Sequence, residues 1–544
     1  MSKSFVSYNR FNIEASYDAI IIGSGMGGLS AGAFLSKEGK KVLILEQHYT
    51  AGGYTQIFKR KDYEWDIGIH YIGDVERPNS QIRQMFDYVT NGNLKWADMG
   101  QVYDKIIFGD EVYEFHKGKE NFKKQLKTYF NTPEDHKAID KYLDLVKSAQ
   151  RTSRMFFAEK ALPPAVSWIF AGNMRKRMLE FSRKTTREVL QSLTSNEKLI
   201  GVLTGQYGDY GLPPGKSSFI MHSILVNHYM NGGFFPVGGS AAILQNVAPV
   251  IKEAGGDILV CAEVKEIIVE GNKAVGVMME DGKKILAPLV ISSAGVINTY
   301  AKLLPEKIQA KHKFTDKLDK VTPSVSYICL YIGFKEDATA LGLEKPNLWV
   351  YPENSYNHDE NVERYINDPS AEFPVVYFSF PSAKDPDWPN RYPGKSTIDI
   401  ITLAPYDWYT EWEDTRWKKR GEAYDAKKED LSQRLLQVMY KYLPQLKGKV
   451  DYYELSTPLS TKHFMHYEKG ELYGLDHVPE RFNQRFLRAH TPVKNLFLTG
   501  QDIVSAGVGG ALASGMLTAS AILKRDLSAK IRKAATKVPA DQDA

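Results

Sequence analysis

The chain has 544 residues, of which 43% are hydrophobic and 25% are charged, so it can build a large core and several domains. Its net charge of +5 is small for this length and argues against nucleic-acid binding. Its two cysteines, Cys261 and Cys329, lie far apart in the sequence. That spacing excludes a disulfide scaffold and a cysteine zinc site, and we expect no metal. The first residues lack the apolar core of a signal peptide, so we expect a cytoplasmic protein.

The first predicted elements form a strand, a helix and a second strand within 17–46. Residues 18–22 and 40–45 are apolar runs typical of buried strands, and 29–37 has helical spacing. A G-x-G-x-x-G motif joins the first strand to the helix; it allows a tight turn, close approach to a pyrophosphate and close helix packing. The alternative is a purely structural turn. The predicted nucleotide ligands are Gly23, Ser24, Gly25, Met26, Gly27 and Gly28.

The second strand ends at Glu46, near the ~20-residue spacing at which an acid binds ribose hydroxyls. An acid at this position disfavours a 2′-phosphate and favours NAD or FAD. Gly52 and Gly53 follow, and a glycine pair lets the backbone lie against an extended cofactor.

The segment from Glu46 and Gln47 to the run GIHYIG at 68–73 resembles the family of phytoene desaturases, carotenoid isomerases and retinol saturases. It is most similar to the retinol saturase branch, although Tyr54 stands where carotenoid desaturases more often have arginine. The resemblance implies FAD as the cofactor, with Gln47 and Gly68 among its ligands. It also implies that His70 and Tyr71 lie near the flavin as candidates for proton delivery. The alternative is a histidine bonded to backbone beside the cofactor, and Asp66 and His228 are weaker candidates.

Residues 76–230 are rich in charge and aromatics, with a helical stretch at 134–151. Within 151–184, aromatic side chains alternate with basic ones. This pattern is typical of a peripheral membrane surface or, equally, of a helix pair with a core face and a solvated basic face.

From residue 234 the pattern becomes α/β again, with a helix at 241–254 and strands at 258–260, 264–269, 274–279 and 289–292. In the family this segment contacts the adenine, which implies a role for Val264. Residues 300–455 are highly aromatic, and alternation at 325–334 and 375–380 predicts a second sheet. The aromatic residues belong either to a core or to a substrate tunnel.

The final signal is the run NLFLTGQD at 495–502, which resembles the family's carboxy-terminal flavin motif. The resemblance implies that Gly500, Asp502, Gly509 and Gly510 contact the flavin or its ribityl chain. The uncharged stretch 503–523 is long enough for a membrane span, but its small residues favour a tightly packed helix. Residues 528–544 are expected to be a flexible tail.

The predicted fold class is α/β, with a discontinuous Rossmann-type FAD-binding domain and an inserted α+β substrate-binding (capping) domain that carries a second sheet. The FAD domain is expected to comprise 1–75, 231–300 and 456–527. The cap is expected to comprise 76–230 and 301–455.

The expected function is an FAD-dependent oxidoreductase that acts on carbon–carbon double bonds of a hydrophobic polyene, isoprenoid or lipid, by hydride transfer at flavin N5. The external electron partner would be NAD(P)H or a quinone. A redox-neutral cis–trans isomerase is the second hypothesis. Amine oxidases and prenyl-binding escort proteins share the fold family and stay open as alternatives. The sequence leaves the oligomeric state undetermined.

Overall fold

The computed structural model describes residues 4–13 and 16–535. Its first sheet has six parallel strands in the order β1, β10, β3, β2, β14 and β20. All residues of the central strands β2 (Ala19–Ile22) and β3 (Val42–Leu45) are buried, as their continuous apolar runs predict. The other four strands are β1 (Val6–Ser7), β10 (Asp257–Val260), β14 (Val290–Ser292) and β20 (Leu496–Leu498).

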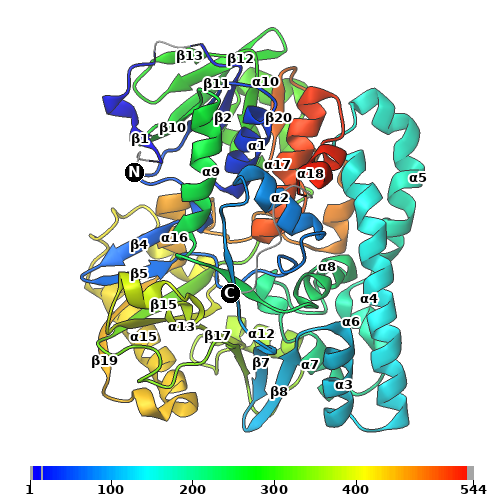
Figure 1. The fold of residues 1–544 in the computed structure, drawn as a ribbon, viewed down its shortest axis with the longest axis vertical. Coiled ribbons are helices and arrows are strands. Elements are labelled where there is room, and N and C mark those ends of the chain that lie inside the picture. The colour runs from blue at the N-terminus through cyan, green and yellow to red at the C-terminus, as the bar shows by residue number, and fades with distance from the viewer. Residues whose placement is uncertain (1–3, 14–15, 536–544) are drawn as a thin grey trace.

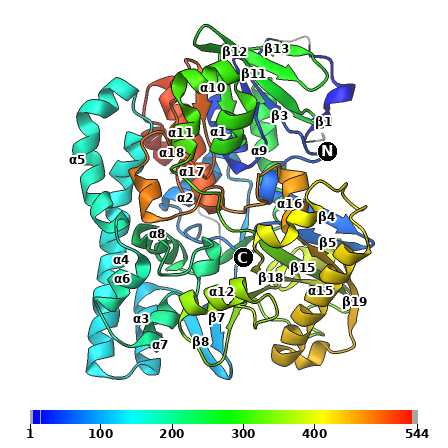
Figure 2. The ribbon, with the colours of Figure 1, turned by 180° about the vertical axis from the view of Figure 1, so that it is seen from behind.

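Helix α1 (Met26–Ser36) packs against α9 (Ala241–Glu253) and α17 (Gly507–Leu523) beside this sheet (Figures 1 and 2). Small residues make the α1–α17 contact close, since a Cβ on Gly515 would lie 2.0 Å from Ser30 Oγ. The prediction of a packed helix within 503–523 is confirmed. In the described part of the chain, no helix has both the length and the apolar character of a membrane span.

The second sheet has seven strands in the order β19, β15, β18, β17, β16, β7 and β8, antiparallel except for the pair β16–β7. Strand β15 (Tyr327–Phe334) is buried along its whole length, which matches the predicted strand at 325–334. The other strands are β7 (Val102–Phe108), β8 (Glu111–His116), β16 (Asn347–Tyr351), β17 (Val376–Ser379), β18 (Ser396–Leu403) and β19 (Val450–Ser456).

A hairpin of β4 (Ile57–Arg60) and β5 (Tyr63–Asp66) packs on this second sheet, where Trp65 and Tyr331 share a small aromatic cluster. A three-stranded antiparallel sheet extends from the cofactor side. Its strands are β11 (Val264–Glu270), β12 (Lys273–Met279) and β13 (Lys284–Leu286). A short ribbon pairs β6 (Trp96–Asp98) with β9 (Phe234–Pro236).

Helices from 119–229 form one side of the molecule, with α4 (Pro133–Glu159) and α5 (Pro164–Ser182) at its outer edge (Figure 1). The other helices on this side are α3 (Lys119–Tyr129), α6 (Thr186–Gln191), α7 (Glu197–Leu203), η3 (Tyr207–Asp209) and α8 (Phe219–Tyr229).

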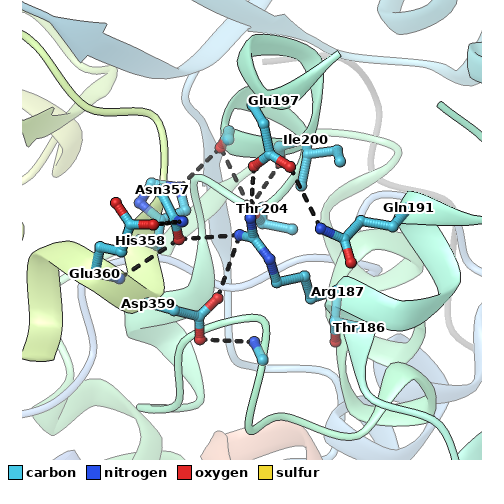
Figure 3. Close-up of polar contacts among 12 residues, drawn as sticks. Thr186, Arg187, Gln191, Glu197, Ile200, Thr204, Asn357, His358, Asp359 and Glu360 are labelled. Atoms are coloured by element: carbon cyan, nitrogen blue, oxygen red, sulfur yellow. Dashed lines mark hydrogen bonds and ion pairs between the residues drawn. The ribbon is translucent and has the colours of Figure 1, made fainter. Parts of the chain in front are cut away.

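Arg187 joins this helical side to the segment around α12 (His358–Asn367), as Figure 3 shows. Its guanidinium donates to Asn357 Oδ1 at 3.0 Å and to Glu197 Oε2 at 2.6 Å, and lies 3.4 Å from Asp359 Oδ2. Two distant parts of the chain are therefore cross-linked around one cation.

The remaining elements connect or cover these layers. They are η1 (Tyr8–Arg10), η2 (Gly53–Thr55), α2 (Gln81–Val89), the π-helix Asn298–Leu303, α10 (Glu306–His312), α11 (Phe314–Leu318), α13 (Pro381–Lys384), α14 (Trp388–Arg391), η5 (Tyr406–Trp412), α15 (Glu422–Tyr442), η6 (Pro444–Leu446), α16 (Pro458–Met465), η7 (Pro479–Asn483) and α18 (Ser528–Ala535).

The expected flexible tail at 528–544 is wrong for its described part, because Ser528–Ala535 forms helix α18. Leu527 and Ile531 are four positions apart and both are buried, and α18 packs against α2. The segment is polar in composition, yet burial of these two apolar side chains is enough to hold it as a helix against the domain. Residues 536–544 lie outside the described part.

Candidate active site

One large cavity runs from the carboxyl ends of the first sheet to the second sheet. At the nucleotide end it is lined by many of the predicted FAD ligands, and at the other end by aromatic side chains of the second sheet. The predicted ligands that line it are Gly23, Gly25, Met26, Gly27, Glu46, Gln47, Gly53, Gly68, Val264 and Gly500.

Glycines shape the nucleotide end in two different ways. A Cβ on Gly28 would lie 2.1 Å from Gly23 O, and one on Gly53 would lie 2.7 Å from Gly25 Cα, so these positions hold backbone against backbone. A Cβ on Gly25 would meet no protein atom within 4 Å, and Gly25 is the N-cap of α1. The first N–H groups of α1 therefore begin beside open space, as an anion site requires.

Glu46 is buried at the end of β3 and organises the turn around it. Its Oε2 accepts hydrogen bonds from Ser24 N at 2.9 Å and Ser24 Oγ at 2.7 Å, and its Oε1 accepts one from His48 N at 2.9 Å. Ser24 Oγ in turn accepts a bond from Gly52 N at 2.9 Å. Ser24 and Gly52 thus hold the acid in place, although they do not line the cavity.

At the carboxy-terminal end, the cavity meets α17 at Gly507, Val508 and Ala511. The predicted Gly509 and Gly510 lie in α17 but outside the lining; a Cβ on Gly510 would lie 2.2 Å from Ser505 O. Both oxygens of Asp502 accept backbone bonds, from Leu475 N at 3.0 Å and Val296 N at 2.8 Å. Asp502 therefore holds the loops around the site, and a direct flavin contact for it stays a prediction.

These residues fit an FAD molecule. An open anion site at the start of α1, a fixed acid at the ribose position and an extended cavity leading to α17 match the parts of this dinucleotide in order. The same cavity continues past Gly68 and His70 to Tyr327, Tyr331, Trp349 and Tyr377, which leaves an apolar space beyond the cofactor.

His70 lines the cavity where its cofactor and aromatic parts meet. Its Nδ1 lies 3.4 Å from Asp399 Oδ2, and its ring stands edge-on to Tyr377 with a centroid distance of 5.5 Å. Asp399 is fully buried within β18, and this burial raises the pKa of its carboxyl group.

Tyr71 points away from the lining into a buried polar cluster. Its hydroxyl lies 3.0 Å from Asp104 Oδ2 and 2.8 Å from Asp209 Oδ2, and its ring stacks on Tyr229. Of the two acids, Asp209 lines the cavity and Asp104 does not. Tyr71, predicted as a catalytic candidate, thus reaches the cavity through Asp209.

Lys384 lies behind this cluster as a buried cation. Its Nζ donates to His70 O at 2.9 Å and Ser379 Oγ at 2.8 Å, and it also donates to Asn347 Oδ1. Burial lowers the pKa of Lys384 to about 7, while the charge of Asp104 works in the opposite direction.

The two weaker candidates, Asp66 and His228, lie outside the cavity lining. Asp66 accepts a hydrogen bond from Ser240 N at 2.7 Å, and burial raises its pKa to about 7. His228 Nε2 accepts a hydrogen bond from Gly73 N at 2.9 Å, and burial lowers its pKa to about 4. His228 is therefore neutral at pH 7, and its hydrogen bond fixes the backbone at Gly73, which is a structural role.

Comparison with known proteins identifies the family. The model described as flavin containing amine oxidoreductase matches residues 26–523. The chain belongs to this family. The all-trans-retinol 13,14-reductase of Danio rerio is 37% identical over 529 residues, covering 94% of this chain and 86% of that protein. The chloroplastic prolycopene isomerase of Arabidopsis thaliana is 24% identical over 549 residues, covering 94% of this chain and 84% of the isomerase.

Among solved structures, wild-type putrescine oxidase bound to putrescine has a TM-score of 0.60 at 15% identity, covering 94% of this chain and all of that one. At this identity the likeness concerns the fold alone. The chain is therefore an FAD-dependent oxidoreductase, and the predicted fold class and family resemblance are confirmed.

Sequence reasoning missed the polar groups contributed by the second sheet and the helical side. Asp104, Asp209, Lys384 and Asp399 belong to no motif. One signal was available, because Asp104 in β7 and Asp399 in β18 are each the single acid of a strand that is mostly buried. A buried acid in such a strand needs partners or a function.

Proposed function

We propose that this protein reduces a carbon–carbon double bond of a hydrophobic polyene that resembles retinol. One observation carries the proposal: an all-trans-retinol 13,14-reductase is 37% identical across 94% of the chain. The aromatic continuation of the cofactor cavity supports it, because a long apolar substrate needs such a lining.

FAD, when bound and reduced by an external donor, would supply a hydride to the substrate carbon. We propose that the nucleotide is held by the glycines of the β2–α1 turn and by Glu46, with the adenine beside Val264. The aromatic walls formed by Tyr327, Tyr331 and Trp349 would exclude water and align the polyene. The proposed cofactor domain comprises 1–75, 231–300 and 456–527, and the proposed cap comprises 76–230 and 301–455.

We propose NAD(P)H or a quinol as the external electron donor. The decisive experiment incubates purified protein, FAD and all-trans-retinol anaerobically with each donor and measures product mass. Reduction adds two mass units, whereas cis–trans isomerisation leaves the mass unchanged. A prolycopene isomerase 24% identical to the chain makes isomerisation the second candidate. If neither product forms, peroxide release over an amine panel would indicate an amine oxidase, and protein that stays colourless with excess FAD would indicate an escort protein.

We also propose that α5 docks on a membrane surface containing anionic lipid. Its outward side exposes Trp168, Ile169 and Phe170 with 78%, 67% and 53% of their areas accessible. The inner side of α5 is buried, so the exposed aromatics are not its core face. Exposed basic side chains occur on α4, along α5 and just after its end, at Arg151, Arg154, Lys176, Arg177, Arg183 and Lys184. Exposed aromatic side chains and exposed cations on the same pair of helices match the chemistry of an acidic lipid surface.

Vesicle co-sedimentation tests this surface. Trp168→Ser should weaken binding to phosphatidylserine-containing vesicles about 10- to 150-fold, because one inserted aromatic contributes roughly 1.5–3 kcal/mol. Leu286→Ser, which changes a residue 64% exposed on β13, is the matched control and should bind like the wild type. Equal binding by both variants would contradict the proposal, as would binding that does not depend on anionic lipid.

A further inference from the structure

We propose that Asp209 is the acid that protonates the substrate, with Tyr71 and Asp104 as the residues that position it. The inference rests on the proposed reduction and adds the group that supplies its proton. In that reaction one alkene carbon takes a hydride from reduced flavin, which an external nicotinamide or quinol has reduced. The neighbouring carbon takes a proton from Asp209: the O–H bond breaks, a C–H bond forms in place of the π bond, and Asp209 becomes a carboxylate.

The fold holds Asp209 firmly at the wall of the cavity. It ends the short helix η3, and the preceding carbonyl, Gly208 O, accepts bonds from the hydroxyls of Tyr327 at 3.1 Å and Tyr473 at 3.0 Å. Trp349 packs so closely that a Cβ on Gly208 would lie 2.6 Å from its ring. All three aromatic residues also line the cavity. The residues that enclose the substrate space therefore fix the position of the acid.

The geometry around Tyr71 requires a proton on one of the two acids. A tyrosine hydroxyl has one hydrogen, yet it lies within hydrogen-bond distance of both Asp104 Oδ2 and Asp209 Oδ2. Both bonds form only if one carboxyl group is protonated and donates to the tyrosine oxygen. Two close carboxyl groups that share a donor are expected to retain a proton for the same reason.

The remaining partners decide which acid keeps the proton. Asp104 accepts a bond from Gln206 Nε2 at 2.6 Å on one oxygen and from Asn347 Nδ2 at 2.8 Å on the other. Burial raises the pKa of Asp104 to about 7, and the donors on both of its oxygens oppose that effect and stabilise its charged form. Within the described chain, Asp209 has Tyr71 as its side-chain hydrogen-bond partner, and its own surface faces the cavity. The arrangement therefore places the proton on Asp209, with Tyr71 donating to Asp104.

The surrounding charges agree with this assignment. Burial and the charge of Asp104 raise the pKa of Asp209 to about 8, against the opposing effects of Tyr71 and Lys384. Asp209 is then protonated at neutral pH and loses its proton as the pH rises above about 8. The other titratable groups that feel its charge are Tyr210, Tyr229, Tyr327, Tyr351, Tyr377 and Tyr473.

The same cluster can stabilise the carboxylate that forms. After proton transfer, the Tyr71 hydroxyl can turn from Asp104 to Asp209, and Asp104 keeps its bonds to Gln206 and Asn347. Asp209 then regains a proton from water when the product leaves the cavity.

Asp209→Asn tests the inference, because the amide keeps the shape and the contact to Tyr71 but is a poor acid. Reduced, FAD-loaded protein is mixed anaerobically with all-trans-retinol, and reoxidation of the flavin is followed in a single turnover. We expect the variant to react about 100-fold more slowly or worse, as for loss of a general acid. Flavin content and reoxidation by ferricyanide should match the wild type. In the wild type the rate should fall above about pH 8.

Asp476→Asn is the control, since burial also raises the pKa of Asp476 to about 7 but that side chain does not line the cavity. In Tyr71→Phe the reaction should still occur, but the pH above which its rate falls should differ from that of the wild type, as expected of a positioning residue. An Asp209→Asn variant that reoxidises its flavin at the wild-type rate would overturn the inference. So would a result in which His70→Gln slows this reaction and Asp209→Asn does not.

A second measurement does not need the reaction. Infrared difference spectroscopy of the apoprotein at neutral pH should show the C=O stretch of a protonated carboxyl group that Asp209→Asn removes and Asp476→Asn retains. Absence of a band assignable to Asp209 would overturn the inference even if retinol is reduced. Wild-type protein that shows the band but leaves retinol and other polyenes unchanged would instead refute the proposed function.

Discussion

The replacement Gly25→Ala separates binding of the cofactor from folding of the domain. Gly25 has φ −59° and ψ 169°, which alanine adopts readily, and the added Cβ would meet no protein atom within 4 Å. The apoprotein should therefore fold, and a reduced entropy of the unfolded chain should make it more stable by about 0.4–1 kcal/mol. The new methyl group would occupy the open space at the start of α1, where we place the pyrophosphate.

The effect on FAD follows from the same geometry. A methyl group forced into a filled site typically costs about 1–3 kcal/mol, so the dissociation constant for FAD should rise by roughly one to two orders of magnitude. Titration of apoprotein with FAD, followed by flavin fluorescence, measures the affinity. Thermal unfolding of the same apoprotein without FAD measures the stability.

Gly28→Ala is the matched comparison in the same motif. Its Cβ would lie 2.1 Å from Gly23 O, a backbone atom of the turn that cannot move away alone. We expect this variant to lose about 3 kcal/mol or more of unfolding free energy before any ligand is added. The reasoning is refuted if Gly25→Ala binds FAD like the wild type, or if its apoprotein is the less stable of the two variants.

Three further predictions concern single side chains. Glu46→Gln can keep both bonds from Ser24 on its carbonyl oxygen but loses the one from His48 N, which should lower the unfolding free energy of the apoprotein by about 1.5–3 kcal/mol; a looser ribose acid should also show as weaker binding in FAD titration. His70→Gln should stay yellow yet turn over more slowly in steady-state assays; loss of flavin would instead make His70 a cofactor ligand. Arg187→Ala should lower the unfolding free energy by about 1–2 kcal/mol in urea denaturation with flavin content unchanged, because its ion pairs are partly exposed.

The nucleotide end of the site could be predicted because its signals are local. The β2–α1 turn and Glu46 lie within 30 residues of sequence. The glycine spacing of the turn and the distance from it to the acid are together specific for a dinucleotide-binding βαβ unit. The element boundaries from this region differ from the structure by a few residues: the helix expected at 29–37 is α1, Met26–Ser36. The helix begins directly after its N-cap, Gly25, three residues before the apolar spacing indicates.

The polar cluster could not be predicted, because its members come together only through the fold. Tyr71 follows the β4–β5 hairpin, Asp104 lies on β7, Asp209 ends η3 and Lys384 ends α13. No spacing in the sequence relates these four positions. The exposed aromatics of α5 were ambiguous for a similar reason, since a sequence pattern does not say which side of a helix meets its neighbour.

Proteins of this fold can catalyse different reactions if the groups that line the substrate end of the cavity differ. The likeness to putrescine oxidase, with a TM-score of 0.60 at 15% identity, covers 94% of this chain and concerns the fold alone. The groups that we expect to choose between hydride transfer to an alkene and oxidation of an amine are contributed by the second sheet and the helical side. An amine substrate needs an acceptor for its proton, whereas alkene reduction needs a donor. Asp209 can be that donor because Asp104, on a neighbouring strand, takes the hydrogen bonds that would otherwise stabilise Asp209 as a carboxylate. Alkene reduction therefore needs two conditions at once: a flavin that the external donor has reduced, and an Asp209 that its neighbours keep protonated.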